Sequence, residues 1–243
     1  MYSSRRGFLI RTCLVSLGTT GLHLSACGGG GGGNTGGGGG GKATPLLDAY
    51  KAEMVSINGS YKMGRTEVTV GMWKEYCAAT GKPMPPAPYW GWIDSHPIVS
   101  VSWYDSDNYA TWAGLRLPTG AEWEFAATGG DGRNYPWGGY GPRIGGNYPG
   151  WDASICVNNS SIGTHPVGSI PAGNSPFGCS DMSGNAWEWC ANYYANDPLL
   201  GKEFRGGGWH WGLQDYFRCA YRYPAKPDLV TFDFGFRLAA GPK

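Results

Sequence analysis

Charged residues are scarce in this sequence, and the scarcity excludes several kinds of partner. Lys, Arg, Asp and Glu make up 15% of the 243 residues and leave a formal net charge of +1. A chain with so small an excess of positive charge lacks the basic surface that holds nucleic acid or an anionic membrane. The low charge, combined with 43 glycines and 17 prolines, also argues against a helical bundle. We therefore expect no nucleic-acid partner.

Motifs for common metal and nucleotide sites are missing as well. The seven cysteines form no C-x-x-C pair, and none of the four histidines lies at ligand spacing beside a cysteine, which argues against zinc. The glycine runs lack the lysine followed directly by serine or threonine that a phosphate-binding loop needs. The sequence thus indicates neither a zinc protein nor a nucleotide-binding protein.

The first 26 residues have the layout of a secretory signal. A pair of arginines precedes an apolar run that Arg11 and His23 interrupt, so the run falls short of the roughly 20 apolar residues of a spanning helix. The stretch SRRGFL resembles the twin-arginine export signal, and LSAC resembles a bacterial lipobox whose cysteine, here Cys27, becomes diacylated. We expect removal of residues 1–26 and lipidation of Cys27. The alternative is a plain signal with a chance cysteine.

A glycine-rich stretch follows the expected lipid site. Residues 28–41 read GGGGGGNTGGGGGG, which offers no side chains whose burial could offset the entropy of ordering. Over residues 27–44 such a coil holds the domain on the order of 20 Å from the lipid. We therefore expect an exported protein at the outer membrane and cell surface of a bacterium. Its membrane contact is the lipid alone, and one folded domain covers residues 45–243.

Five cysteines remain in that domain, an odd number for an exported chain. This number favours up to two disulfides with one thiol left over. Cys190 with Cys219 is the preferred pair and Cys156 with Cys179 the second, although spacing alone leaves the connectivity open. Cys77 lies in a helical stretch and is most simply a core thiol.

Alternating apolar residues predict several short strands. The first two cover residues 54–59 and 64–70, and the run PIVSVSW at 97–103 is also strand-like. Beyond Asp131 the pattern fades for about fifty residues, which is typical of long loops. Three strand-like segments then close the chain: NAWEWCANYY, FRGGGW and FDFGFRLAA.

Capping residues predict three helices. Thr69 can cap a helix over residues 70–81, and a short helix covers residues 105–114. Thr119 and Glu122 fit a capping box, in which the threonine oxygen accepts from the third amide and the glutamate returns to the amide of the cap.

Longer segments resemble one family, in order along the chain. They are HPIVSVSWYDSDNYATWAGLRLPTGAEWEFAATGG, YPWGG, GTHPVGSIPAGNSPFGCSDMSGNAWEWC, FRGGGW and GFRLA. Together they resemble the formylglycine-generating enzyme, or sulfatase-modifying factor, domain family over residues 53–240. The resemblance implies an α+β domain with an elaborated C-type lectin fold. In that fold short helices surround small antiparallel sheets, and much of the chain is irregular loop.

The same resemblance raises two kinds of enzyme. Formylglycine-generating enzymes oxidise a substrate cysteine with copper held by two cysteine thiolates, the soft ligands that a cuprous ion requires. The matching segment here, residues 208–222, contains Cys219 alone, at a position used in the family for disulfide pairing. The sulfoxide-synthase branch needs a histidine-rich iron site, whereas His96 and His165 precede prolines in loops where a structural role is expected. We predict no catalysis; an oxidase-type enzyme with an altered metal site is the alternative.

A calcium site is a separate implication of the resemblance. The motif DMSGNAWEW matches family residues that bind this hard cation through two side-chain oxygens and two backbone carbonyls. The matching residues are Asp181, Gly184, Ala186 and Glu188. A second site would use Asn147 and Asn159, at looser spacing. No cofactor is required beyond this structural calcium, and the alternative is a metal-free turn that Asp181 caps.

Residues 205–237 resemble the variable segment of a subset of this family, the variable proteins of diversity-generating retroelements. Their layout is closest to twin-arginine-exported variable lipoproteins. A retroelement rewrites such a segment at template adenines and leaves fixed stretches, here called frame residues. The frame residues are RGGGW at 205–209, RCA at 218–220, Arg222, PD at 227–228 and GFR at 235–237.

The residues between the frame, here called filler residues, mix aromatic and polar types without a period, which favours a ligand-binding surface over a core. The expected ligand-binding residues are His210, Trp211, Leu213, Gln214, Asp215, Tyr216, Tyr221, Tyr223, Lys226, Thr231, Phe232 and Asp233. The ligand would be a protein or a glycan. One alternative is that Trp211, Tyr216 and Tyr221 pack against a sheet. Another, for the function, is a structural envelope lipoprotein with a constant face.

Overall fold

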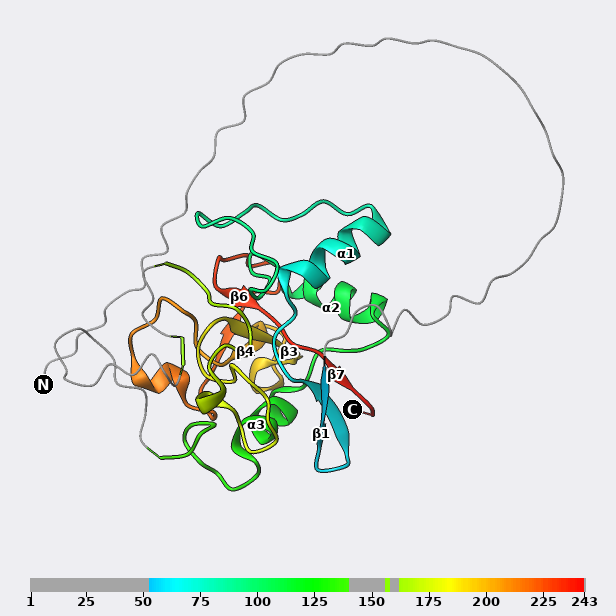
Figure 1. Cartoon of the computed structure of the whole chain (residues 1–243). Helices are drawn as coiled ribbons and strands as arrows, with labels where there is room; N and C mark the ends of the chain where they lie inside the picture. Colours follow the sequence, from blue (N-terminus) through cyan, green and yellow to red (C-terminus); the bar gives the residue numbers. More distant parts are fainter. Residues whose placement is uncertain (1–52, 140–155, 158–161, 243) are drawn as a thin grey trace, which may run out of the picture. The chain divides into compact units, whose positions relative to one another are not determined.

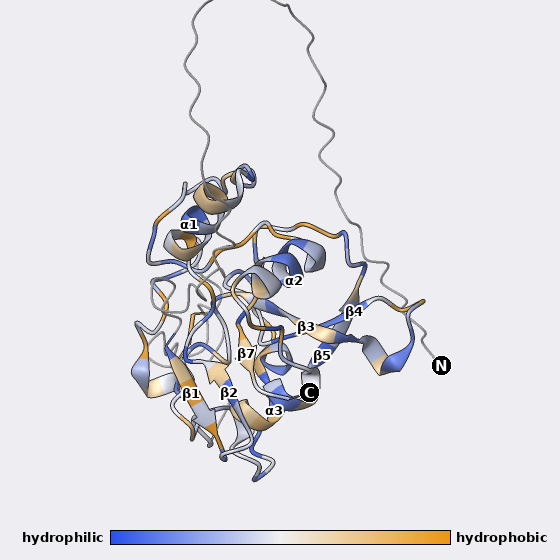
Figure 2. Ribbon diagram, turned by 90° about the vertical axis from the view of Figure 1, so that its right-hand side faces the viewer, coloured by the Kyte–Doolittle hydropathy of each residue, from blue (hydrophilic) through white to orange (hydrophobic). Residues whose placement is uncertain are grey.

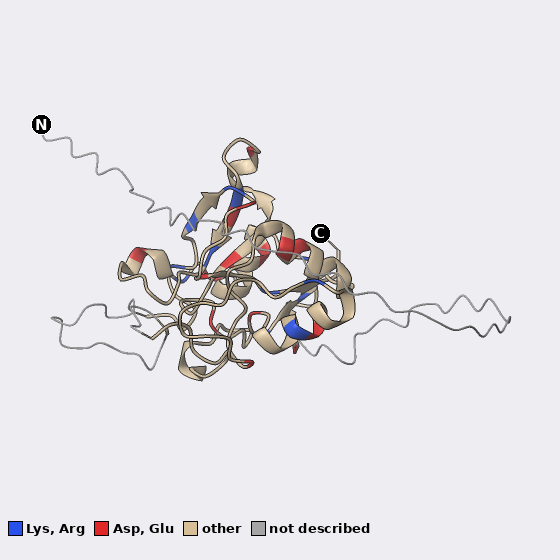
Figure 3. Cartoon of the chain, turned by 90° about the horizontal axis from the view of Figure 1, so that it is seen from above, with Lys and Arg blue, Asp and Glu red and all other residues tan. Residues whose placement is uncertain are grey.

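The computed structural model describes residues 53–139, 156–157 and 162–242. The predicted signal at 1–26, the lipid site Cys27 and the tether up to residue 44 lie outside the described residues. Within the described part of the chain, no helix is long and apolar enough to cross a membrane. Residues of both charge signs are interspersed along the described chain, as the low net charge leads one to expect (Figure 3).

A small antiparallel sheet joins the two ends of the described chain. Strand β1 (Met54–Ile57) pairs with β2 (Tyr61–Gly64) through a tight turn, and β2 pairs with β7 (Ala239–Ala240). The predicted strand at 54–59 is confirmed, but the prediction of a strand at 64–70 is wrong. The amide of Arg65 still bonds to the carbonyl of Glu53, in register with β1, but the Arg65 carbonyl accepts from the amide of Ser180, so the chain leaves the ladder after Arg65.

Three helices form where the capping residues predict them. Helix α1 (Val70–Thr80) begins at Thr69, whose hydroxyl accepts from the amide of Met72 at 3.2 Å. Helix α2 (Trp103–Trp112) begins two residues earlier than predicted, because Ser102 and Asp105 form a capping box there. Helix α3 (Gly120–Thr128) carries the capping box predicted for Thr119 and Glu122.

A second sheet has the order β5-β4-β3-β6 (Figure 1). Strand β3 (Trp187–Tyr193) pairs antiparallel with β4 (Lys202–Arg205) and parallel with β6 (Phe234–Gly235), and β4 pairs antiparallel with β5 (Arg222–Ala225). The strand predicted at 97–103 is reduced to an isolated bridge between Thr69 and Pro97. Helices α1 and α2 lie on one side of the β3–β4 pair and α3 on the other (Figure 1, Figure 2).

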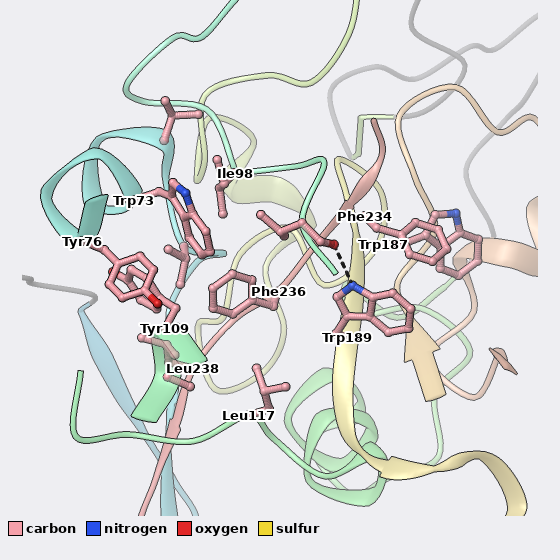
Figure 4. Close-up of a cluster of buried hydrophobic side chains, with 14 of the residues drawn as sticks. Trp73, Tyr76, Ile98, Tyr109, Leu117, Trp187, Trp189, Phe234, Phe236 and Leu238 are labelled. Carbon is pink, nitrogen blue, oxygen red and sulfur yellow. Dashed lines mark hydrogen bonds between the residues drawn. The ribbon is translucent and has the colours of Figure 1, made fainter. Parts of the chain in front are cut away.

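Aromatic side chains fill the space between α1, α2 and the second sheet (Figure 4). Trp73 of α1 stacks on Tyr109 of α2 with ring centroids 5.3 Å apart, and both rings meet Phe236 edge-on. The indole nitrogen of Trp189 donates to the carbonyl of Val101 at 3.2 Å, which satisfies its one buried donor. This core supports β3 and β6, on which the C-terminal loops rest.

The cysteine predictions need correction. Cys190 and Cys219 are free thiols, fully buried in a second apolar cluster with Trp123 and Met182. Burial raises the pKa of the Cys219 thiol to about 12. Cys179 is a free thiol in the same cluster, so neither predicted disulfide is formed in the structure. These thiols behave as small apolar core residues, and Cys77, as predicted, is a buried thiol of α1.

Candidate ligand-binding face

The frame residues of 205–237 are held by buried charge pairs. Arg205 contacts Glu203 at 2.7 Å and Glu124 at 3.1 Å, and its guanidinium also donates to the carbonyl of Cys219. Arg222 reaches the second oxygen of the same Glu203 at 3.3 Å. The buried Glu203 thus links β4 to β5, and its partner Arg205 reaches the loop between these strands.

Arg237 forms a second buried pair, below β3. Its guanidinium donates to both carboxylate oxygens of Glu188, at 2.6 and 2.7 Å, and to the carbonyl of Ser180. Glu188 also accepts from the indole nitrogen of Trp123 at 2.7 Å. A buried ion pair with its lone pairs and protons satisfied resists rearrangement. The frame residues therefore act as a rigid support.

Glycines of the frame allow close packing under the filler residues. Gly207 has a φ of +80°, and a Cβ there would lie 2.6 Å from the ring of Phe217. A Cβ on Gly208 would lie 2.9 Å from the ring of Trp187. Both positions leave no room for a side chain, so the loop that follows β4 lies directly on these rings.

Three filler rings pack on Trp187 of β3. The centroids of Trp211, Tyr216 and Tyr221 lie 6.4, 6.1 and 6.0 Å from that of Trp187, and all three rings are half-buried. One side of each ring thus packs against Trp187 of the sheet, as the alternative interpretation of these three residues expects. Their outer edges remain accessible to a partner.

Asp233 is not a surface residue. It is 3% exposed, and its carboxylate accepts from the indole nitrogen of Trp211 at 2.8 Å and the hydroxyl of Thr231 at 2.5 Å. The residue expected as a ligand contact thus lies beneath the accessible surface, where these partners supply the compensation that a buried carboxylate needs. Asp233 instead positions Trp211 and Thr231 of two separate loops.

His210 lies beside the same carboxylate. Its Nδ1 is 3.5 Å from Asp233, and its ring lies between those of Trp209, Trp211 and Phe232 at 4.9 to 5.1 Å. Burial lowers the pKa of His210, while the charge of Asp233 acts in the opposite direction. The ring is therefore a half-buried member of the aromatic cluster.

The remaining filler residues form the accessible part of the face. Among the large apolar side chains, Leu213, Tyr223 and Phe232 are 59%, 51% and 45% exposed. Asp215 is exposed and pairs with Arg218 at 2.7 Å. Gln214 and Lys226 are exposed as well. This mixture of accessible rings and polar groups is typical of protein binding sites.

Two aromatic residues outside the predicted segment join this face. Trp90 meets Trp209 edge-on at 5.1 Å, and Tyr89 lies 6.3 Å from Trp209. Sequence analysis missed both, because nothing local connects residue 90 with residue 209. The available signal was the proline-rich stretch KPMPPAPYW, which presents two aromatic residues at its end.

The residues that match the calcium motif do not fit a calcium ion. Both oxygens of Glu188 are engaged by Arg237 and Trp123, and the Asp181 carboxylate accepts from the amide of Gly168 at 2.6 Å. Within the described ranges, no three His, Cys, Asp or Glu side chains are grouped to hold a metal ion. Asn147 and Asn159 of the second expected site lie outside the described residues.

A third buried carboxylate, that of Glu67, lies near Asp181 and Glu188. It is fully buried, and one of its oxygens accepts from the amide nitrogen of Asn185 at 3.0 Å. Burial and the nearby charges of Asp181 and Glu188 raise the pKa of Glu67 well above its usual value, while Arg237 opposes them. The glutamate was not singled out from the sequence because its partners lie more than a hundred residues away.

The geometry for copper oxidation is also incomplete. Cys219 is the one cysteine of residues 208–222, its thiol is buried, and burial raises its pKa to about 12. A cuprous site of the family type needs two accessible thiolates. His96, whose Nδ1 lies 3.0 Å from the hydroxyl of Thr164, is part of a loop contact.

The chain is similar in sequence to one protein family and to several known proteins. The sulfatase-modifying factor enzyme 1-like domain matches residues 32–241. The formylglycine-generating enzyme of Mycobacterium tuberculosis is 36% identical over 177 residues, which cover 60% of this chain and 58% of that enzyme. The serine/threonine-protein kinase pkn1 of Chlamydia caviae is 40% identical over 165 residues, which cover 61% of this chain and 24% of the kinase. The chain thus spans about half of the first relative and a quarter of the second.

Solved structures share the same layout. PvdO of Pseudomonas aeruginosa superimposes with a TM-score of 0.62 at 24% identity, over 75% of this chain and 80% of PvdO. Treponema denticola variable protein 1 gives 0.59 at 24% identity, over 75% and 84% of the two chains. The Major Tropism Determinant I1 variant gives 0.51 at 14% identity, over 77% and 52%. The predicted α+β fold of the C-type lectin type is confirmed, and the chain belongs to the sulfatase-modifying factor enzyme 1-like domain family.

Proposed function

We propose that this protein is a lipid-anchored binding protein, displayed at a bacterial surface, that recognises a ligand with the filler residues of 205–237 and catalyses no reaction. The single observation that supports this best is the division of labour within the segment. Frame residues such as Arg205 and Arg237 are buried and paired, whereas Leu213, Tyr223 and Phe232 are accessible. A rigid support under accessible rings is what a diversified binding site requires.

The retroelement origin is part of the same proposal. The fold is shared with Treponema denticola variable protein 1 and with the Major Tropism Determinant I1 variant. Rewriting the filler residues would change the accessible rings while the buried charge pairs of the frame preserve the fold.

The first experiment is to sequence the DNA that flanks the gene. We expect a near-copy of the codons for residues 205–237 beside a reverse-transcriptase reading frame. The copy should differ from the gene at its adenines and at the filler codons. If no such copy exists, the retroelement origin is refuted, and a binding protein with a constant face takes its place.

The absence of catalysis is tested separately. The protein, loaded with copper, is incubated with a cysteine-containing sulfatase peptide, and oxidation of that cysteine is followed by mass spectrometry. We expect no turnover, because residues 208–222 supply one buried thiol where a family copper site needs two thiolates. Turnover that Cys219→Ser abolishes would replace the binding proposal with an oxidase.

Anchoring is tested by Cys27→Ala. We expect the wild-type protein in the membrane fraction, accessible to protease added to whole cells, and the variant in a soluble fraction. A variant that still sediments with membranes would contradict the lipid anchor at Cys27.

A further inference from the structure

A loop outside residues 205–237 lies against Trp209, a frame residue whose ring also contacts the filler residue Phe232, and it extends the surface that the filler residues form. The loop connects α1 to residue 97 and runs toward the segment that precedes β6 (Figure 1). Four prolines between residues 83 and 88 restrict its backbone. At its end, the amide of Gly91 bonds to the carbonyl of Pro88 at 2.9 Å and closes a turn. This turn presents Tyr89 and Trp90.

Ring contacts make one cluster of this turn and the filler residues. Tyr89 and Trp90 are 4.8 Å apart, and Trp90 meets Trp209 at 5.1 Å. Trp209 then contacts Phe232 at 5.7 Å. Tyr89 and Phe232 thus both contact the ring of the buried Trp209, and they are 73% and 45% exposed.

The turn is fixed in place before any ligand arrives. A Cβ on Gly163 would lie 2.6 Å from the ring of Trp90, so the indole rests directly on that backbone. Trp209 is 4% exposed, and its amide bonds to the carbonyl of Asn185 at 2.9 Å. A pre-organised surface loses little conformational entropy when it binds.

We propose that Tyr89 and Phe232 bind a protein partner together and that the partner places an apolar side chain across Trp209. This inference rests on the proposed function of the filler residues. It adds Tyr89, which lies outside residues 205–237 and is here called the constant half, to their variable surface. Rigid aromatic rings around a desolvated centre are typical of protein binding hot spots.

The polar groups of this cluster favour a protein over a glycan. A sugar needs accessible hydrogen-bonding groups beside a ring to hold its hydroxyls. The carboxylate that adjoins this cluster belongs to Asp233, which is buried and occupied by Trp211 and Thr231. The accessible part of the cluster is therefore mainly apolar.

The test uses defined probes on the whole mature protein. A phage-displayed library of random peptides and an array of synthetic glycans are each screened against the wild type. The affinities of the selected peptides are then measured for Tyr89→Ala, for Phe232→Ala and for the double variant. The matched control is Leu199→Ala, because Leu199 is a highly exposed apolar residue outside the cluster. Thermal unfolding of each variant confirms that the fold is retained.

We expect Tyr89→Ala and Phe232→Ala each to weaken peptide binding on the order of tenfold, and Leu199→Ala to leave it unchanged. The double variant should lose less than the sum of the two, because the rings serve one contact. If Phe232→Ala weakens binding and Tyr89→Ala does not, the constant half is refuted while the proposed function stands. If only glycans bind, the protein partner is refuted. If neither ring matters to any selected ligand, the joint contact is refuted; the proposed function fails as well if Leu213→Ala and Tyr223→Ala also leave the binding of those ligands unchanged.

Discussion

Asp233 and Asp215 offer a direct test of how the binding face is built. Both are filler residues, and composition gives no reason to separate them. In the structure Asp233 is buried and accepts from Trp211 and Thr231, whereas Asp215 is exposed and pairs with Arg218. Replacing each by alanine therefore removes the same carboxylate from two opposite environments.

The expected losses of unfolding free energy differ clearly. A hydrogen bond to a charged group contributes about 1.5–3 kcal/mol, and Asp233→Ala removes two of them. The variant also removes a buried charge, and the desolvation that this relieves offsets part of the loss. We expect Asp233→Ala to lower the free energy of unfolding by about 2–4 kcal/mol. An exposed ion pair contributes about 0–1 kcal/mol, which sets the loss for Asp215→Ala.

Urea unfolding, monitored by tryptophan fluorescence, measures the loss of unfolding free energy in each variant relative to the wild type. Asp233→Asn keeps one carbonyl oxygen as an acceptor and should fall between the wild type and Asp233→Ala. The reasoning is refuted if Asp233→Ala is destabilised no more than Asp215→Ala. That result would return Asp233 to the accessible surface, as the sequence alone suggested.

Three further predictions concern the support beneath the face. The folded-state pKa of Glu67 lies above its usual 4.5, so the stability of the wild type should fall as pH rises from about 4.5 toward the folded-state value. Thermal melts between about pH 4 and pH 8 should show a flatter dependence of stability on pH in Glu67→Gln than in the wild type. An equally steep dependence in the variant would contradict the burial of this charge. Gly207→Ala should cost about 1–3 kcal/mol more than Gly132→Ala in urea unfolding, because both glycines have a positive φ but only Gly207 has a ring against its Cβ position; equal losses would show that the loop can move aside. Alkylation in denaturant without reductant should label both Cys190 and Cys219, which are free thiols in the structure, whereas a peptide linking the two in the mass spectrum would restore the predicted disulfide.

Local structure was predictable wherever neighbours in the sequence determine it. The caps at Thr69 and Thr119 follow from hydrogen bonds that span three residues, so the starts of α1 and α3 could be read from the sequence. The strand expected at 64–70 was misplaced for the opposite reason. Glu67 and Val68 are both buried by distant segments of the chain. The amide of Val68 bonds to the carbonyl of Phe236 and not to a neighbouring strand.

The candidate binding face could be proposed as a segment of the sequence but not as a surface. Frame and filler residues could be separated through the family resemblance, which fixes Arg205 and Arg237 as frame residues. Burial could not be assigned, since the bond from Trp211 to Asp233 joins residues 22 apart and the contact from Trp90 to Trp209 joins two loops. Long-range packing thus decided which polar filler residue became a support and which aromatic residues joined the surface.

The layering of the face limits how it could be diversified, if residues 205–237 vary as proposed. Trp211, Tyr216 and Tyr221 rest on Trp187, so changing any of them removes packing from β3 as well as contact area for a ligand. Trp211 is further tied to Asp233, so a smaller apolar residue at 211 would leave a buried carboxylate short of a donor. Variation at such positions changes stability and recognition together. An exposed position such as Leu213 carries no such ring contact, and a protein near its stability threshold would tolerate the widest range of side chains there.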